Sequence, residues 1–415
     1  MIRSVFAAVM LSTAFLTQSS LHAQITLDSI MATIERQNPM LQEYDSKVKA
    51  IYEYAKGAGS WMAPMVGAGT FMTPYPNQML MEEGDKGAIM FSFEQDIPNP
   101  AKQNASRKFI ASRAAVEQQN RAVQFNQLRS DAKQSYYQWL VGEKKLKALK
   151  ESEEIVTLMI RLARIRYPYN QGSLGNIYKA EGRLSEVQNM IEMTAGDIEE
   201  SAARLKGLMN ISNETDLNID TTIQVGIDLK SIQYDTATLH DQRSDVRQID
   251  QSIEVMRMNQ RVQRFQAKPD FRIRFDHMQP IGNMPTQFTA MAMISIPIAP
   301  WSSKMYRSEV KGMEFEIDAM KKERSAILIE AKSMLAAMSS QLTRMQQQLR
   351  NYESKIIPAL NKNYQAVMLA YEENREELPM VIDAWEAHNM ANLEYLEKLQ
   401  DYYNMIVAYE KELEK

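Results

Sequence analysis

Residues 101–169 read AKQNASRKFIASRAAVEQQNRAVQFNQLRSDAKQSYYQWLVGEKKLKALKESEEIVTLMIRLARIRYPY, and this stretch decides the fold. Its only glycine is Gly142 and its only proline is Pro168, while apolar residues such as Leu128 and Ala132 recur at helical spacing. At about 1.5 Å per residue, an uninterrupted helix over this range is roughly 100 Å long. Its faces carry too many charges for lipid, so the apolar stripe must be covered by other long helices.

The order helix, two strands, long helix, break and return helix is predicted twice, which divides the chain after a signal peptide at residues 1–23. For the first repeat, residues 24–226, the predicted elements are a helix at 26–57, two strands within 65–97, the long helix 101–169, a return helix 174–208 and a non-helical patch 210–226. For the second repeat, residues 227–415, they are a helix at 237–267, two strands at 271–278 and 288–298, a long helix 302–371 and a closing helix 378–413.

Matching landmarks support an internal duplication. Pro98 and Pro300 are 202 positions apart, whereas Leu174 and Leu378 are 204 positions apart. A period of this size, sustained along the chain, is typical of a structural repeat. The return helix 174–208 and the helix 237–267 together approach the length of a long helix, as do the closing helix 378–413 and the helix 26–57, so we expect each pair to lie end to end beside one long helix.

The predicted strands alternate strictly between apolar and polar residues. In 271–276, Phe271, Ile273 and Phe275 alternate with two arginines and an aspartate. Strands of about 10 residues with this alternation are typical of a transmembrane barrel, and also of an ordinary sheet with one buried face. Four strands leave two open edges, which hydrocarbon does not tolerate. We therefore expect either a soluble sheet or a barrel closed by several copies, of which three would give about twelve strands.

The amino-terminal residues are typical of a secretory signal. Arg3 precedes an apolar core at 5–16, and the small residue Ala23 fits a cleavage site; the alternative is a retained membrane anchor. No other segment reaches about 18 consecutive apolar residues, so no transmembrane helix is expected. The chain has no cysteine, which excludes disulfides, thiolate nucleophiles and the acylated cysteine of a lipoprotein.

No catalytic constellation is visible, and we expect neither an enzyme nor a cofactor. The net charge is −4 and the four histidines are scattered, so the sequence favours neither nucleic acid nor a histidine metal site. Asp245 with Asp250 or Glu254 could form a carboxylate pair, but acidic residues at this spacing more often form a solvated helix face.

Several segments resemble the TolC-like outer-membrane factors, the exit ducts of bacterial tripartite efflux pumps and of type I secretion. The segments that carry this resemblance are Gln95-Asp96-Ile97-Pro98-Asn99-Pro100-Ala101-Lys102, Ile296-Pro297-Ile298-Ala299-Pro300, Arg243-Ser244-Asp245-Val246-Arg247, Ala267-Lys268-Pro269-Asp270 and the helix turns at 169–180 and 371–384. The resemblance covers essentially the whole mature chain.

The resemblance implies a mainly α fold with a small membrane β part. Long α-helical hairpins of three chains would form an α-barrel in the periplasm, continuous with a 12-stranded β-barrel in the outer membrane, four strands coming from each chain. It also implies passive conduction, a periplasmic adaptor and an inner-membrane pump, most often of the RND type. The helix turns would form the periplasmic tip.

The resemblance also suggests roles for residues at this tip. Tyr371 and Asp383 match positions where some members carry gate residues, and Glu376 stands where an arginine or glycine often occurs. The acidic run that contains Glu376 would favour cations at a threefold axis, or would be a solvated helix end. The expected adaptor-docking residues are Gly172, Ser173, Leu174 and Leu378.

Thirty methionines are many for a chain of 415 residues. Alternation assigns Met72, Met90, Met291 and Met293 to the polar, lumenal face of the strands, and thioethers suit Cu(I) and Ag(I). The junction 95–102 most resembles factors paired with heavy-metal pumps, so copper or silver export is one hypothesis, beside drug efflux and type I secretion. The alternative is that methionine fills irregular gaps.

Two other function classes remain. A secreted structural coiled-coil protein would account for the long helices but not for strands at matched positions. A periplasmic adaptor normally has one hairpin flanked by β domains, whereas two hairpins and four strands are predicted.

Overall fold

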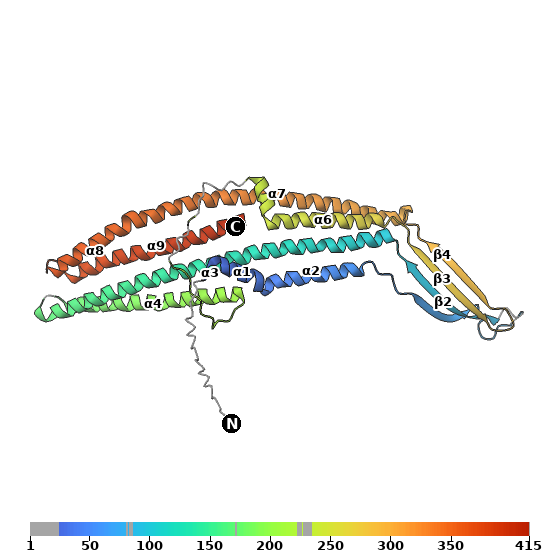
Figure 1. Ribbon diagram of the computed structural model, residues 1–415, viewed down its shortest axis with the longest axis horizontal. Coiled ribbons are helices and arrows are strands. Elements are labelled where there is room, and N and C mark those ends of the chain that lie inside the picture. Colours follow the sequence, from blue (N-terminus) through green and yellow to red (C-terminus); the bar gives the residue numbers. More distant parts are fainter. Residues whose placement is uncertain are drawn as a thin grey trace, which may run out of the picture.

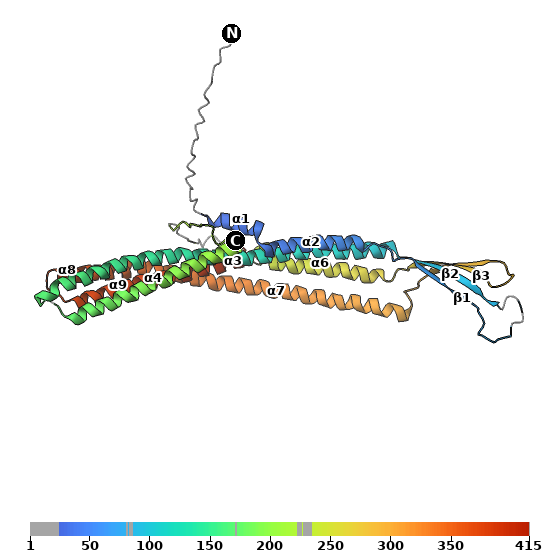
Figure 2. The ribbon, with the colours of Figure 1, turned by 90° about the horizontal axis from the view of Figure 1, so that it is seen from below.

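The computed structural model describes residues 25–79, 82, 86–170, 172–221, 226 and 235–414. Within these ranges the protein is an elongated bundle of helices with a sheet at one end and two helix turns at the other (Figure 1, Figure 2). No helix in these ranges is long and apolar enough to cross a membrane. The predicted signal peptide and parts of the loops at 80–85 and 222–234 lie outside the described residues.

The first half of the chain is built around one helix. Its elements are α1 (Leu27–Gln37), α2 (Pro39–Gly57), β1 (Met65–Phe71), β2 (Ala88–Ile97), α3 (Pro100–Arg166), the 3₁₀ turn η2 (Tyr167–Tyr169) and α4 (Leu174–Met209). The uninterrupted α3 has 67 residues and begins where the Asn99 side chain accepts a hydrogen bond from the Ala101 amide. Pro100 stands in the first turn, where its missing N–H costs nothing.

The predicted helix at 26–57 is two helices. Asn38 separates α1 from α2 with an extended backbone at ψ 123°. The cause is Pro39, because a proline ring disfavours the helical conformation of the residue before it. Asn38 then caps α2, its side-chain oxygen accepting a hydrogen bond from the Met40 amide at 2.9 Å.

The second half has more interruptions. Its elements are α5 (Thr236–Gln242), α6 (Ser244–Phe265), β3 (Phe271–Pro280), β4 (Gln287–Ile294), α7 (Pro300–Asn351), the π-helical turn η3 (Tyr352–Ile356), α8 (Ile357–Glu372) and α9 (Leu378–Leu413). The predicted helix at 237–267 is divided at Arg243, and the predicted strand that ends at Ile298 ends at Ile294 instead.

The predicted helix at 302–371 is also interrupted, by η3. Pro358 follows directly; it donates no backbone hydrogen bond, and its ring would clash with the carbonyl of Ser354 four residues earlier. A wider π turn next to a proline relieves such a clash while the chain keeps its direction. The second rod is therefore α7, η3 and α8 in succession.

The sheet joins the two halves. Its order is β1-β2-β3-β4 with all neighbours antiparallel, and the central pair β2–β3 comes from different halves. Directly paired residues share a face, so Phe93 and Phe275 lie on one face, whereas Asp96 and Arg272 lie on the other. The apolar face is solvent-exposed in the single chain: Phe91 is 51% and Phe288 70% exposed.

The helices pack as two hairpins side by side, each with a divided return arm (Figure 1). Helices α2 and α4 lie end to end along α3, and α6 and α9 lie end to end along the second rod. The predicted pairing of 174–208 with 237–267 and of 378–413 with 26–57 is therefore wrong. The largest core cluster lies near the middle and includes Leu140, Leu205 and Ile406; a second cluster, which includes Met159 and Trp385, lies toward the helix turns.

Both end-to-end junctions are polar, but with different chemistry. In the first half, the Asn38 side chain donates a hydrogen bond to the Leu208 carbonyl at 2.9 Å, and that of Asn210 donates to the Gln37 carbonyl at 3.3 Å. These neutral amides join the last turn of α4 to the first turn of α2. They satisfy carbonyls that have no partner within the helix.

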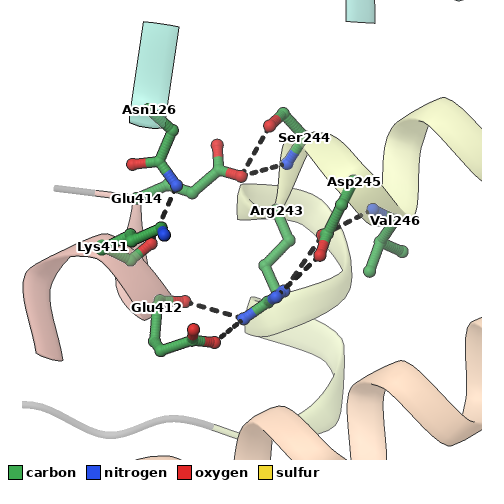
Figure 3. A network of polar contacts seen from close by, with 8 residues as sticks. All are labelled: Asn126, Arg243, Ser244, Asp245, Val246, Lys411, Glu412 and Glu414. Carbon is green, nitrogen blue, oxygen red and sulfur yellow. Dashed lines mark hydrogen bonds and ion pairs between the residues drawn. The ribbon is translucent and has the colours of Figure 1, made fainter. Parts of the chain in front are cut away.

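In the second half the junction is ionic (Figure 3). The Arg243 guanidinium binds Asp245 at 2.7 Å and Glu412 at 2.6 Å. The Glu414 carboxylate accepts hydrogen bonds from the Ser244 amide and hydroxyl at 2.7 and 2.6 Å. The last residues of α9 thus cap the first turn of α6, where a negative charge is stabilised by the helix dipole.

Candidate functional site

The two helix turns lie at the end of the molecule opposite the sheet (Figure 1). One joins α3 to α4 and the other joins α8 to α9. Each contains an asparagine in the left-handed conformation, Asn170 with φ 57° and Asn374 with φ 60°. Asparagine tolerates this conformation better than most residues, so both turns are sharp.

Arg166, at the end of α3, connects the two hairpins at this tip. Its guanidinium donates hydrogen bonds to the carbonyls of Tyr371 at 2.6 Å and Glu372 at 3.0 Å, and lies over the Tyr371 ring at 4.2 Å. Those carbonyls belong to the last turn of α8, where the regular i+4 amide donors are missing and the helix dipole favours a cation. The Tyr371 carbonyl also accepts a hydrogen bond from the Asn374 amide at 3.0 Å. The contact combines charge-assisted hydrogen bonds with a cation–π interaction.

Two further cations of the first hairpin bind acids of the second. Lys179 of α4 lies 2.9 Å from the Asp383 carboxylate of α9, and Arg183 of α4 pairs with Glu386 of α9. Lys179 and Asp383 are 41% and 58% exposed, so this pair alone contributes little stability. We call Arg166, Lys179 and Arg183, with these partners, the tip clasp.

Tyr371 is a packed residue. Its side chain is 3% exposed and lies in the cluster with Val381, Ile382 and Trp385. Burial raises the pKa of the Tyr371 phenol, and the nearby Arg166 opposes that rise. The phenol is therefore neutral at physiological pH, and Arg166 contacts both the side chain of this residue and its backbone carbonyl.

The remaining predicted tip residues divide by exposure. Glu376, Gly172 and Ser173 line a cleft of about 560 Å³ between the two turns, and Ser173 caps α4 by accepting a hydrogen bond from the Asn176 amide at 3.3 Å. Leu174 is 42% exposed. Leu378 is only 4% exposed, belongs to the core cluster and lines the same cleft; its part in adaptor docking stays a prediction.

Sequence reasoning missed the cations of the clasp, although one signal was available. Lys179 and Asp383 are separated by 204 positions, the spacing that relates Leu174 to Leu378. Opposite charges at equivalent positions of two adjacent hairpins indicate an ion pair. Arg166 binds backbone carbonyls, and no sequence pattern marks such partners.

All the methionines of the four strands lie on the charged face of the sheet. Met90 pairs with Met278, and Met291 and Met293 pair with Arg274 and Arg272, which places all four methionines on the charged face. Met72 is predicted on the charged face of a strand, but it lies just after the end of β1, in the left-handed conformation with φ 51°. In β1 it is Met65, paired with Glu94, that lies on the charged face. Binding of a soft metal there stays a prediction.

The acidic residues of α6 do not form a carboxylate pair. Asp245 binds Arg243, Asp250 binds Arg324 and His240, and Glu254 binds Arg257. Each carboxylate thus has its own cation. Among the described residues, no group of three or more His, Cys, Asp or Glu residues could hold a metal ion.

Comparisons with known proteins agree with this architecture. No family model and no curated protein matches the chain. Among solved structures, the outer-membrane channel OprN matches with a TM-score of 0.73 at 14% identity, over 93% of this chain and 89% of that one. The outer membrane protein VceC from Vibrio cholerae gives 0.71 at 12% identity, over 93% and 95%.

A crystal structure of CusC, determined in a study of its folding and transmembrane channel formation, matches with a TM-score of 0.74 at 12% identity, over 94% of this chain and 92% of that one. The matches are close to full length in both directions. The chain therefore has the fold of these outer-membrane channels, as its resemblance to the TolC-like outer-membrane factors implied.

Proposed function

We propose that three copies of this chain form a duct that crosses the outer membrane and extends through the periplasm. The duct conducts passively, and an inner-membrane pump of the RND type drives cargo into it through a periplasmic adaptor. The fold shared with OprN, VceC and CusC supports this proposal. The main argument for it comes from the open edges and the exposed apolar face of the sheet.

The backbone N–H and C=O groups along the two outer edges of the sheet have no partner strand among the described residues. Within the described ranges, β1 and β4 each have a single neighbouring strand, so each presents backbone groups without a strand partner along one side. One face of the same sheet is apolar and exposed, with Val66 at 78% and Phe275 at 44%. Such a face suits lipid, but an open edge in hydrocarbon costs several kcal/mol per unsatisfied group. Closure with other copies solves both problems.

Three copies give a barrel of about twelve strands, an even number wide enough for a water-filled lumen. The helices also favour neighbours of the same kind. Exposed apolar residues lie along the rods, including Met193 at 64%, Phe315 at 68% and Ile329 at 67%. In a tube of helical hairpins from three chains, such residues pack between adjacent chains.

At the tip, the clasp holds the second hairpin against the first and closes the duct, with Tyr371, Glu376 and Asp383 as gate residues. Opening requires the clasp to separate. Gly172, Ser173 and Leu174 are exposed beside the cleft and form the docking surface for the adaptor. An adaptor that favours the separated hairpins would shift the tip toward the open state.

Soft-metal cargo, Cu(I) or Ag(I), is the finer proposal within this function. Thioethers of Met65, Met90, Met278, Met291 and Met293 share the charged face of the sheet. A strain that lacks the protein should lose copper and silver tolerance. Unchanged tolerance to both metals, with lost drug tolerance, would instead favour drug efflux.

Cysteine crosslinking tests the closed trimer, because the chain has no cysteine of its own. Ala68 on β1 and Ala290 on β4 lie on the same face at opposite edges of the sheet. A68C combined with A290C, and with V66C or T70C in place of A68C to scan the register, should give a covalent trimer in outer-membrane fractions.

Each single-cysteine variant is the control and should give no crosslink, because β1 of one chain meets β4 of the next. A ladder beyond three chains, or no crosslink at any register, would contradict closure by three copies.

A further inference from the structure

We infer that five charged residues on one face of the sheet, Glu94, Asp96, Arg272, Arg274 and Asp276, set the charge selectivity of the duct and favour cationic cargo. We call them the charged belt. This inference rests on the proposed function, because only a closed barrel places that face in a lumen.

The belt contains every Asp, Glu, Lys and Arg of the four strands. All five residues come from the central strands β2 and β3, and the register places them on the face opposite the phenylalanines of these two strands. The edge strands β1 and β4 have none. In a trimer the lumen therefore has three charged stripes separated by uncharged ones.

Arg272 connects the two central strands. Its guanidinium lies 2.8 Å from the Glu94 carboxylate and 2.6 Å from that of Asp96. Arg274 binds Asp276 of its own strand at 3.0 Å. Asp96 and Arg272 also line a cavity of about 830 Å³ at the junction of sheet and helices, so the belt begins where the helical tube would open into the barrel.

The belt has more negative than positive charges. Three carboxylates oppose two guanidiniums, which leaves −1 for each chain and −3 for a trimer. Every charge is paired, so the local field is weak, but the sum is not zero. In a narrow pore with low-dielectric walls, a ring of net charge raises the local concentration of ions of opposite sign. The belt therefore attracts cations.

Holding the strands in register does not require this many charges. A cross-strand ion pair contributes little stability, and the apolar face already fixes the register, because a slip by one residue would exchange the two faces. The belt could serve only to hold the strands together, or it could set the ion selectivity of the duct. A measurement of ion selectivity distinguishes these two roles, whereas a measurement of stability does not.

The test measures reversal potentials of single channels in planar bilayers under a KCl gradient at low ionic strength, where screening is weakest. All variants carry E376Q and E377Q, so that the acidic tip does not determine the selectivity. R272Q should increase the preference for K⁺ over Cl⁻ several-fold. E94Q with D96N should lower it below that of the parent protein or reverse it.

Two variants separate charge from structure. R272K keeps the charge and should keep the parent selectivity, even if it loses the double contact. K56Q removes one exposed positive charge from α2, outside the sheet, and should also keep it. Heat-stable trimers in each variant show that the barrel has formed.

The outcomes are distinguishable. If no channels form with the parent protein, the proposed function fails and the inference fails with it. If channels form but R272Q and E94Q/D96N leave the reversal potential unchanged, the duct stands and the inference about the belt is overturned. A shift shared by R272K would also overturn it, since geometry and not charge would then be responsible.

Discussion

The two rods of the molecule have similar lengths and different continuity. α3 runs through 67 residues without a break, whereas α7, η3 and α8 divide the same path at Tyr352–Ile356. α3 contacts helices of both halves, including α4, α6 and α9. The first rod is therefore the fixed support of the chain, and the second rod has a built-in place to bend.

The bend is held by side chains of the facing helix. The Tyr395 hydroxyl of α9 donates a hydrogen bond to the Glu353 carboxylate within η3 at 2.6 Å. Between η3 and the tip, α8 and the facing part of α9 form the end of the second hairpin. The tip clasp attaches this end to the first hairpin. The comparison suggests that gating bends the second hairpin against a stiff first one.

Introducing a break into the stiff rod should have the largest effect. Glu154 of α3 is 204 positions before Pro358 and is exposed, so E154P changes mainly the backbone. We expect a loss of about 3 kcal/mol or more from the missing hydrogen bond and the ring clash. Fewer heat-stable trimers than in the control E154A would show it, and equal trimer stability would contradict the rigid role of α3.

The ionic junction should be more sensitive than the neutral one. The Arg243 side chain is 12% exposed, and R243A leaves two acidic partners without their cation, at a cost of roughly 3 kcal/mol. N38A removes a helix cap worth about 1 kcal/mol. Urea unfolding of the two variants should show this order, and equal midpoints would refute the distinction.

Removing the main contact of the clasp should open the tip. R166A loses charge-assisted hydrogen bonds worth roughly 1.5–3 kcal/mol, so the closed-to-open equilibrium should move by about tenfold or more. Single-channel recordings measure the open fraction. R164A removes an exposed arginine two positions earlier that pairs with Glu181, and it should leave the open fraction unchanged. An R166A channel that stays closed would exclude the clasp as a gate.

Removing the proline next to the π-helical turn of the second rod should have a smaller effect on the open fraction, of opposite sign to that of R166A. P358A restores a backbone donor and allows α7 and α8 to become continuous. We expect slower amide hydrogen exchange at residues 352–356 and a stability gain below about 1 kcal/mol. Combined with R166A, it should reduce the open fraction of that variant. An unchanged open fraction in the double variant would argue against bending at η3.

The smallest effect should be a pH dependence confined to the second hairpin. Burial lowers the pKa of His388, which stacks on Tyr364 with ring centroids 6.3 Å apart. The unfolded chain binds a proton near about pH 6.5, where folded His388 is still neutral. Stability is therefore retained above that pH and falls as the pH drops below it.

H388F keeps the stacking and removes the titration. Thermal unfolding at pH 7.5 and pH 5.5 should show a smaller acid-induced loss for this variant than for the unmodified protein. The same loss in both would assign the pH dependence to other groups.

Periodicity predicted the elements well and their interruptions poorly. α3, α4 and α9 begin and end within about three residues of the predicted ends, because long apolar stripes and capping residues mark them. The breaks at Asn38, Arg243 and η3 lie inside stretches with unbroken helical spacing. Pro39 and Pro358 explain two of these breaks, but a proline alone does not indicate whether a helix kinks, divides or widens.

Contacts between distant segments limited the site prediction more. Arg243 belongs to a segment recognised from the sequence, yet its partner Glu412 is 169 positions away. The burial of Leu378 depends on which side of α9 faces α8. Alternation placed Met72 on the charged face, whereas the register places the odd-numbered residues of β1 there and β1 ends at Phe71. These facts follow from packing, which a single sequence does not specify.

The most direct test of the central claim is the mass of the detergent-solubilised protein by native mass spectrometry. A closed barrel built from four-stranded contributions predicts a complex of three chains that persists until denaturation. A stable single chain, or a protein that stays in solution without detergent, would contradict the account, because neither closes the two edges of the sheet in lipid.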